Sequence, residues 1–179
     1  MKRIPAKIRK KAKKIKLLLL DVDGVLTDGS IVINGRGEEI KRFHVRDGEG
    51  IKLLLSAGIN VGLITDRSST AVTHRAKELG IPIVYQRVRD KVGVYEKIKS
   101  TIRLGDREIA YVGDDLADLP LLKRVGLAVA VRDCWPELKR LVDHVTEKAG
   151  GKGAVREVAQ ILLKAQKKWN QVIEKYSRD

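Results

Sequence analysis

The chain has 179 residues, of which 43% are hydrophobic, 34% are charged and 4% are aromatic. The apolar content suffices for a folded core and excludes a chain that is disordered throughout, while the scarcity of aromatic residues disfavours a nucleic-acid module that works by base stacking. The single cysteine, Cys134, excludes an internal disulfide and a thiolate zinc site, which is typical of a protein from a reducing compartment.

The formal net charge of +14 is concentrated at the start of the chain, where residues 2–16 carry nine Lys or Arg and no acidic residue. We therefore divide the chain into a basic segment, 1–14, and a single domain, 15–179. The segment is either a solvated helix or tail, or a contact for nucleic acid or another anionic surface. Its apolar run is too short for a secretion signal, and no stretch is long enough to span a membrane, so we expect a cytoplasmic protein.

The first half of the domain predicts four elements from its apolar patterns and turn residues. A continuous apolar run indicates a buried strand, and two short extended stretches around Gly35-Arg36-Gly37 predict a β-hairpin that forms a flap. A helix that ends at Gly58 and a second buried strand follow. In order, these elements span 15–21, 30–45, 48–58 and 59–65.

The second half alternates helices and strands. Ser68 or Ser69 is expected to cap the first of these helices and Gly80 to end it, while an apolar stripe near the carboxyl terminus predicts one long last helix. The predicted elements are, in order, a helix 68–80, a strand 81–86, a helix 90–100, a strand 108–114, a helix 116–126, a strand 127–131, a short helix 135–141, an edge strand 143–146 and a long helix 153–176.

This alternation indicates an α/β fold built on a doubly wound parallel sheet that helices cover on both faces. Sheets of this kind bind ligands in the crevice at the carboxyl ends of their strands. The polar residues that follow the strands are therefore the candidates for function.

The residues at the strand ends predict a metal site. Two carboxylates about 4 Å apart repel each other by roughly 4 kcal/mol at an effective dielectric near 20, and a divalent cation offsets that repulsion. All-oxygen ligands suit Mg²⁺, so we expect Asp21, Asp23 and Asp114 to bind it. The polar residues at the strand ends are Asp21, Asp23, Thr65, Asp66, Arg67, Lys91, Asp114, Asp115 and, one turn on, Asp118.

The same residues predict phosphoryl transfer. Asp21 is expected to attack phosphorus and form an aspartyl-phosphate, with Mg²⁺ bridging the two. Asp23 is expected to donate a proton to the leaving oxygen and then to activate water. Thr65 and Lys91 are expected to hold the other phosphoryl oxygens, and Lys91 to neutralise charge in the transition state.

Receiver domains are the nearest rival, because they gather acids, a Thr and a Lys around magnesium on a similar sheet. In those domains an acidic pair follows the first strand and the phosphorylated aspartate follows a middle one. Here Asp21-x-Asp23 comes first and an aspartate pair follows the fourth strand, which favours an enzyme. Residues 149–155 lack the spacer and the Ser/Thr of a nucleotide-binding P-loop. A second hypothesis stays open, in which a phosphatase-like fold serves binding or regulation and its basic start contacts nucleic acid.

These motifs resemble haloacid dehalogenase-type phosphatases. The matching parts are DVDGVLTDG (21–29), Thr65-x-Arg67, Lys91 and YVGDDLADLP (111–120). The resemblance is closer to a cap-less branch, the 3-deoxy-D-manno-octulosonate 8-phosphate phosphatases, and covers about residues 15–165. The stretches that carry this closer match are FHVRDGEGIKLL (43–54), YVGDDLADLP and AGGKGAVREV (149–158).

The resemblance implies a Rossmann-like, haloacid dehalogenase-like fold with no large cap domain, where the hairpin after the first strand stands in for the cap. It implies a homotetramer in which hairpins associate and a neighbour's tail can close the site. The implied substrate is a phosphorylated eight- or nine-carbon ulosonic acid, as in lipopolysaccharide biosynthesis, whose carboxylate suits Arg67 and Arg75. The residues that it places around the substrate are Asp23, His44, Val45, Arg46, Asp47, Gly48, Lys52, Arg67, Arg75 and Lys91.

The sequence departs from the family pattern at Asp66, where the family usually has Gly, and at Arg87 and Arg89, where it favours small or neutral polar residues. A carboxylate added beside an anion site is unfavourable unless it points away or pairs with Arg67. These departures bear on the substrate more than on the reaction. A nine-carbon sialic-type acid phosphate and a broad set of sugar phosphates therefore remain alternatives.

Overall fold

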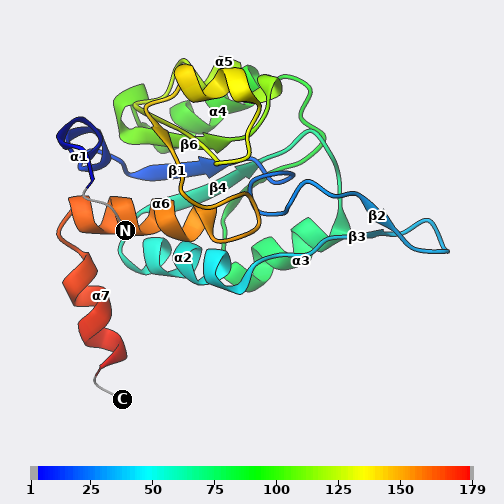
Figure 1. Ribbon diagram of the computed structural model, residues 1–179, viewed down its shortest axis with the longest axis horizontal. Coiled ribbons are helices and arrows are strands. Elements are labelled where there is room, and N and C mark those ends of the chain that lie inside the picture. The colour runs from blue at the N-terminus through cyan, green and yellow to red at the C-terminus, as the bar shows by residue number, and fades with distance from the viewer. Residues whose placement is uncertain (1–3, 178–179) are drawn as a thin grey trace.

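The computed structural model describes residues 4–177, so Lys2 and Arg3 of the basic segment lie outside the described residues. Six strands form one parallel sheet in the order β5-β4-β1-β6-β7-β8 (Figure 1). This topology confirms the predicted α/β fold with a doubly wound parallel sheet. The strands are β1 Leu17–Leu20, β4 Asn60–Ile64, β5 Ile83–Tyr85, β6 Ile109–Gly113, β7 Leu127–Ala130 and β8 His144–Val145.

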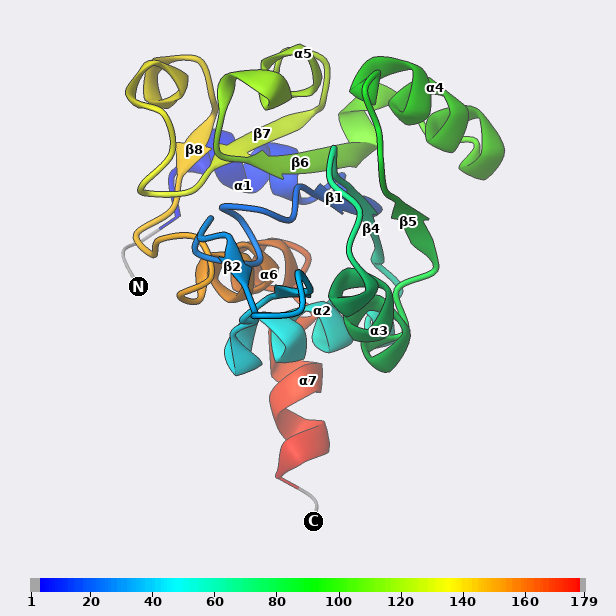
Figure 2. The ribbon, with the colours of Figure 1, turned by 90° about the vertical axis from the view of Figure 1, so that its right-hand side faces the viewer.

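The strand β1 lies inside the sheet, and helices enclose it on both faces. Its four leucines are fully buried, and it pairs in parallel with β4 on one side and β6 on the other. The helices α4 and α5 cover one face of the sheet, and α2, α3 and α6 cover the other (Figure 2). A strand enclosed in this way is apolar throughout, which is why the sequence identifies it. The helices are α1 Ala6–Ala12, α2 Val45–Ser56, α3 Thr70–Leu79, α4 Lys91–Ile102, α5 Leu119–Leu122, α6 Ala154–Ala165 and α7 Trp169–Tyr176, with short 3₁₀ helices at Asp106–Glu108, Leu116–Asp118 and Pro136–Arg140.

Most of the basic amino-terminal segment is a helix that packs on the body of the protein. The apolar side chains of Ile8 and Ala12 in α1 join the hydrophobic core, and Lys11 Nζ lies 2.5 Å from Asp143 Oδ2. The remaining cations of α1 face outward because its apolar side is buried. Within residues 4–177, no helix combines the length and the apolar character that a membrane span requires.

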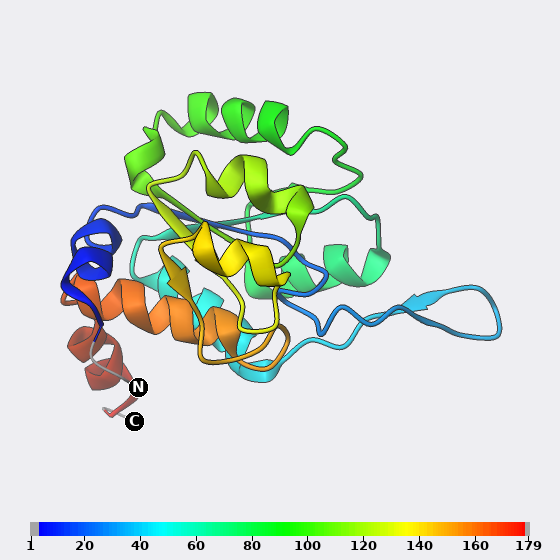
Figure 3. The ribbon, with the colours of Figure 1, turned by 45° about the horizontal axis from the view of Figure 1, so that its top comes forward.

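The predicted hairpin leaves the body of the protein after β1 and projects away from it (Figure 3). Its strands, β2 Val32–Ile33 and β3 Glu39–Ile40, pair antiparallel and form a second, two-stranded sheet. Their side chains are largely exposed, and so are those of the turn that joins them. The exposed large apolar side chains of this hairpin are Ile31, Val32, Ile33 and Ile40.

The carboxyl-terminal part differs from its prediction, because the single helix expected over 153–176 is two helices, α6 and α7. The chain turns between them at Lys167, whose φ of 60° is left-handed and ends the α-helical path. Gln166 Nε2 donates to the carbonyls of Ala12 and Ile15, which ties the end of α6 to the segment before β1. Periodicity alone could not detect the break, since the apolar stripe continues into α7 with Trp169.

The helix expected over 116–126 is likewise shorter than predicted. The structure has a 3₁₀ turn at Leu116–Asp118 and a single α-helical turn, α5, that ends at Leu122. Pro120 lies in the first turn of α5, where its missing N–H is tolerated. The 3₁₀ turn is important for the site, because it carries Asp118.

Candidate active site

The predicted catalytic residues meet at one edge of the sheet. Asp21 and Asp23 follow β1, Thr65 follows β4, Asp114 follows β6, and Lys91 is the first residue of α4. The parallel pairing of β1 with both β4 and β6 brings these strand ends side by side. The crevice that the strand order predicts is therefore where these side chains gather.

Lys91 is the central residue of this group, because its side chain contacts two of the carboxylates. Its side chain is only 7% exposed, and Nζ donates to Asp21 Oδ1 at 2.9 Å and to Asp118 Oδ1 at 2.8 Å. A buried ammonium is costly unless it is paired, and here two carboxylates pair with it. These contacts raise the pKa of Lys91 although burial alone would lower it, so the side chain remains a cation.

Asp118 holds the group together, although the sequence placed it only near the site. Its Oδ1 accepts from the Tyr111 hydroxyl at 2.6 Å, and its Oδ2 accepts from the backbone N–H of Asp114 at 2.9 Å. Gly113 is needed beside it, because a Cβ at Gly113 would lie 2.3 Å from Asp118 Oδ2. The spacing Gly113-Asp114-x-x-x-Asp118, on a turn that caps itself, is the sequence signal for such a role.

Three carboxylates of this group are close enough to share a cation. Ligand oxygens of Asp21, Asp114 and Asp118 all lie within 4.8 Å of one another. Both oxygens of Asp118 already accept hydrogen bonds, which leaves Asp21 and Asp114 as the carboxylates more available to a metal. Asp23, which we expected among the ligands, does not have its side chain in this cluster.

The carboxyl groups of this cluster ionise with difficulty when no cation is bound. Burial and the neighbouring Asp118 carboxylate raise the pKa of Asp21 to about 8, although Lys91 opposes that shift. Burial and the same neighbour raise the pKa of Asp114 to about 7. A divalent cation would reverse both shifts by favouring the charged forms. The residues present therefore fit a hard divalent cation.

Glycine in the first loop allows the cluster to close. Gly24 has φ +87°, and a Cβ at this position would lie 2.1 Å from Asp114 Oδ2. The loop around Asp21 and the loop around Asp114 can approach this closely only because the side chain is absent.

Asp23 belongs to a second charged group at the root of the hairpin. Lys41 Nζ, on a side chain only 2% exposed, donates to Asp23 Oδ1 and, at 3.1 Å, to Glu39 Oε1. Arg67 Nη2 donates to the same Glu39 oxygen at 2.9 Å, and its Nε lies 4.0 Å from Asp23 Oδ2. Asp23 Oδ2 is buried and has no hydrogen-bond partner within residues 4–177. This acceptor therefore remains available to a bound molecule.

Lys41 and Glu39 were not identified from the sequence. In the sequence, both resemble the ordinary charged surface residues of a hairpin strand. They lie beside Asp23 and Arg67 only because the hairpin folds back toward the sheet. A basic residue at the end of the second strand of a hairpin, where that hairpin follows a D-x-D loop, is the weak signal that the sequence offered.

Thr65 lies where we expected it, at the end of β4 and only 2% exposed. Its backbone N–H donates to the Tyr85 carbonyl at 3.0 Å, and its carbonyl accepts from Val88 N–H at 3.1 Å. These bonds fix the backbone of Thr65 and of the loop that carries Asp66 and Arg67.

The substrate-binding residues expected in 44–48 have different surroundings. Asp47 is 1% exposed, and its carboxylate accepts from the backbone N–H groups of Gly153 and Arg156 at 3.1 and 2.8 Å. It therefore caps the start of α6. Val45, by contrast, is 81% exposed, and Arg46 lies with it on a groove formed by α2 and α6.

The other cations expected to bind substrate on the helices are Lys52 on α2 and Arg75 on α3. Arg75 Nη1 pairs with Glu78 at 2.7 Å, and its guanidinium lies 6.0 Å from the centre of the Phe43 ring. A Cβ at Gly48 would lie 2.2 Å from Arg75 Nη2, so glycine makes room for Arg75. Phe43, His44 and Gly48 share a pocket with Arg75, whereas Lys52 is exposed on α2.

The glycine-rich turn at 149–153 supports the first loop from the far end of the chain. Gly151 N–H donates to the Val25 carbonyl at 2.9 Å. A Cβ at Gly150 would lie 1.6 Å from the Gly24 carbonyl oxygen, and one at Gly151 would lie 2.5 Å from the Thr27 carbonyl carbon. Only glycine fits at these two contacts, so this turn fixes the backbone beside Asp21 and Asp23.

The chain is similar to known proteins over most of its length. A family model described as haloacid dehalogenase-like hydrolase matches residues 83–158. The chain is 46% identical over 165 residues to 3-deoxy-D-manno-octulosonate 8-phosphate phosphatase KdsC of Escherichia coli (strain B / BL21-DE3), a match that covers 92% of this chain and 88% of the relative.

Two solved structures are similar throughout. One is 3-deoxy-D-manno-octulosonate 8-phosphate phosphatase from Yersinia pestis, with a TM-score of 0.92, 42% identity and coverage of 93% of this chain and 90% of that one. The other is the enzyme of the same name from Moraxella catarrhalis, in complex with magnesium ion, phosphate ion and a KDO molecule. Its TM-score is 0.93, its identity 40%, and the match covers 95% of this chain and 98% of that one.

Proposed function

The chain belongs to the haloacid dehalogenase-like hydrolases and is a phosphomonoesterase, and from that premise we propose that it hydrolyses 3-deoxy-D-manno-octulosonate 8-phosphate through an aspartyl-phosphate, with Mg²⁺ as cofactor. The observation that carries this proposal is the buried group of Asp21, Lys91 and Asp118 beside Asp114 at the carboxyl edge of the sheet. The single cysteine supports the cytoplasm as its place of action.

In the first step, Asp21 is the nucleophile. Its Oδ2 attacks phosphorus while the bond from phosphorus to the sugar oxygen breaks, and Asp23 donates a proton to that leaving oxygen. Lys91 binds Asp21 Oδ1 at 2.9 Å, which orients the other oxygen for attack. The Lys91 ammonium and the Thr65 hydroxyl stabilise the charge on the phosphoryl oxygens.

In the second step, water replaces the sugar. Asp23, now a carboxylate, removes a proton from that water, whose oxygen attacks phosphorus and releases Asp21 and inorganic phosphate. Asp23 Oδ2 is the oxygen suited to both transfers, because Lys41 holds Oδ1 and Oδ2 has no hydrogen-bond partner in the described part of the chain.

Asp21 and Asp114 would hold Mg²⁺, with Asp118 fixing the loop of Asp114 and Lys91 linking Asp118 to Asp21. When bound, the ion supplies positive charge that removes the repulsion between the nucleophile and an anionic phosphate. The Moraxella catarrhalis structure in complex with magnesium and phosphate ions supports Mg²⁺ as the proposed ion.

The proposed sugar is an acidic one. A ulosonic acid phosphate carries a carboxylate besides its phosphate, and we assign its binding to Arg67, whose Nε lies 4.0 Å from Asp23 Oδ2, and to Arg46 and Arg75 on α2 and α3. His44, Val45, Gly48 and Lys52 complete the proposed binding set. A nine-carbon acid of the sialic type is the alternative substrate.

A substrate panel tests the proposal. Phosphate release is measured with Mg²⁺ for the eight- and nine-carbon ulosonic acid phosphates and for simple sugar phosphates. We expect kcat/KM to be highest for the eight-carbon acid by at least tenfold. Preference for the nine-carbon acid would select the alternative, and equal rates for all esters would contradict an acidic sugar as the substrate.

The proposed assembly is a homotetramer held together by hairpins. The apolar side chains of Ile31, Val32, Ile33 and Ile40 are 48–62% exposed on a two-stranded sheet with free edges, and a second copy would cover them. Light scattering should give the tetramer mass, and Ile33→Lys together with Ile40→Lys should lower it. A wild-type monomer at working concentration would contradict the assembly.

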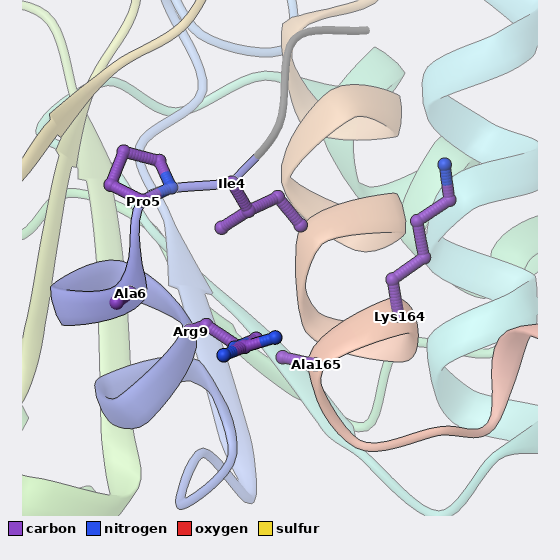
Figure 4. A pocket seen from close by; sticks show the side chains of 6 residues that line it. All are labelled: Ile4, Pro5, Ala6, Arg9, Lys164 and Ala165. Atoms are coloured by element: carbon purple, nitrogen blue, oxygen red, sulfur yellow. The ribbon is translucent and has the colours of Figure 1, made fainter.

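A second candidate function is nucleic-acid binding by α1. The exposed cations Arg9 and Lys10 of α1, and Lys13 and Lys14 just after it, have no ion pair within residues 4–177. An open cavity of about 460 Å³ lies beside the start of α1 and the end of α6, with Arg9 and Lys164 among its lining residues (Figure 4). The buried apolar side of α1 has nothing to insert into a bilayer, which favours a phosphate backbone over a membrane.

Binding of duplex DNA and of RNA at several salt concentrations tests this function. Affinity should fall steeply as salt rises. Replacing Lys10, Lys13 and Lys14 by Gln should remove it and leave phosphatase activity unchanged. No binding at physiological salt would exclude this candidate.

A further inference from the structure

A third carboxylate lies beside Lys91 and has no role in the steps above. Asp66 follows Thr65 in the loop after β4, and its Oδ1 lies 3.6 Å from Lys91 Nζ. This distance permits charge attraction but is too long for a good hydrogen bond. Asp66 is also 53% exposed, so it is neither buried nor locked in place.

The ammonium of Lys91 has three N–H donors. Asp21 and Asp118 take two of them at 2.9 and 2.8 Å. The third donor is the one left for a phosphoryl oxygen, and Asp66 is the remaining carboxylate near it. An incoming phosphate therefore meets a negative charge where it needs a positive one.

Arg67 does not neutralise this charge, although it is the next residue. Its guanidinium faces the hairpin, where Nη2 donates to Glu39 at 2.9 Å and Nε lies 4.0 Å from Asp23. Within residues 4–177, Lys91 is the one ion-pair partner that Asp66 has. A phosphoryl oxygen bound to Lys91 would lie close to the Asp66 carboxylate, and two like charges about 4 Å apart repel by about 1 kcal/mol even in water, which changes binding severalfold.

We propose that Asp66 is a specificity-determining residue that weakens the hold of the site on the phosphoryl group. This inference rests on the proposed function. It means that the organic part of the substrate supplies a larger share of the binding free energy. Small phosphate esters bind poorly because they offer little besides phosphate. Product phosphate leaves readily for the same reason, since it keeps the repulsion and has lost the sugar.

The exposure of Asp66 fits this role better than a structural one. Asp118, which is structural, accepts hydrogen bonds from Lys91, Tyr111 and backbone N–H groups. Asp66 has none of these bonds, so its carboxylate can move aside when a substrate with enough other contacts arrives. Its removal should leave the fold intact.

The test compares Asp66→Asn and Asp66→Gly with wild type, and with Glu108→Gln as a control. Glu108 precedes β6, at the opposite end of that strand from Asp114, so its change alters net charge equally, away from the site. The inhibition constant of inorganic phosphate is measured with Mg²⁺, and phosphate binding is measured directly by calorimetry. Both Asp66 variants should bind phosphate about fivefold more tightly, less so at high salt, and Glu108→Gln should not.

The second measurement compares the Michaelis constants of different phosphate esters. Those for small esters such as phenyl phosphate should fall about fivefold in both Asp66 variants, and that for the preferred ulosonic acid phosphate should change less. Unchanged phosphate affinity in both variants would overturn the inference, and so would a gain in Asp66→Gly alone, which would point to the backbone. A wild-type protein that hydrolyses no phosphate ester contradicts the proposed function instead, because the calorimetric comparison does not depend on turnover.

Discussion

The site contains two charged groups, one around Lys91 and one around Asp23, and different parts of the fold hold them in place. The group around Lys91 is buried, and its Asp118 carboxylate accepts hydrogen bonds from Lys91, from Tyr111 on β6 and from the backbone N–H of Asp114. The group that joins Asp23, Lys41, Glu39 and Arg67 depends on the root of a hairpin whose own side chains are exposed. The difference teaches that the atoms proposed to react with phosphorus sit on the most rigid part of the fold. Asp23, which is proposed to serve the leaving group, is held partly by the hairpin, which is the least supported part of the fold.

The largest effect should come from the buried group. Asp21→Asn removes the nucleophile and should lower kcat by at least about 10⁴-fold. The fold should survive, because a neutral amide replaces a carboxylate that is costly to ionise there. Rapid-quench assays measure kcat, and a thermal melt measures the stability of the fold. A variant that still turns over at the wild-type rate would assign the chemistry to another residue.

The hairpin group should give a smaller and substrate-dependent effect. Lys41→Met removes the donor that orients Asp23 and should lower kcat/KM for a sugar phosphate by about 10–100-fold, a part of what general acid–base catalysis contributes. An activated aryl phosphate needs no proton on its leaving group, so its kcat should fall much less. Equal losses for both substrates would show that Lys41 maintains the structure and does not position Asp23. Lys97→Met, on the surface of α4, is the matched control.

A buried residue outside both groups should affect stability and leave catalysis alone. Asp47→Ala removes the acceptor for two backbone N–H groups at the start of α6 and should lower the free energy of unfolding by roughly 1–3 kcal/mol. Urea unfolding measures this change, and Ser56→Ala, on the exposed end of the same helix, is the control. A loss of kcat/KM at unchanged stability would instead place Asp47 on the substrate, as the family resemblance implies.

The smallest effect concerns pH and metal removal. Folding raises the pKa of Asp21 to about 8 and that of Asp114 to about 7, from an ordinary value of 3.8. The unfolded chain ionises these groups more easily, so in EDTA the stability should fall as pH rises from about 4 to about 8. Mg²⁺ should restore it, raising the Tm by a few degrees at pH 8 and by less at pH 5.5. Asp21→Asn should flatten this dependence, whereas an equal Mg²⁺ effect at both pH values would contradict it.

The sequence predicted Asp21, Asp114 and Lys91 at one edge of the sheet, but not the central place of Asp118 or the contacts of Lys41, for a physical reason. Four consecutive leucines must be buried on both faces, so the position of Asp21 at the sheet edge follows from the strand. Lys91 follows in the same way from the strand and helix pattern around it. Asp118 depends on a 3₁₀ turn, and Lys41 depends on how a hairpin folds back. Neither leaves a periodic pattern, and the turn at Lys167 left none either.

The contact between Gly150 and the Gly24 carbonyl also bears on the order in which the protein is made. The ribosome synthesises the loop of Asp21 early, yet the turn that fits against it emerges only after β8. A nascent chain can therefore form the central strands and still lack the backbone support that this loop has in the finished protein. Catalytic competence should appear late in translation, and products that end before residue 149 should bind phosphate poorly even where their sheet has formed.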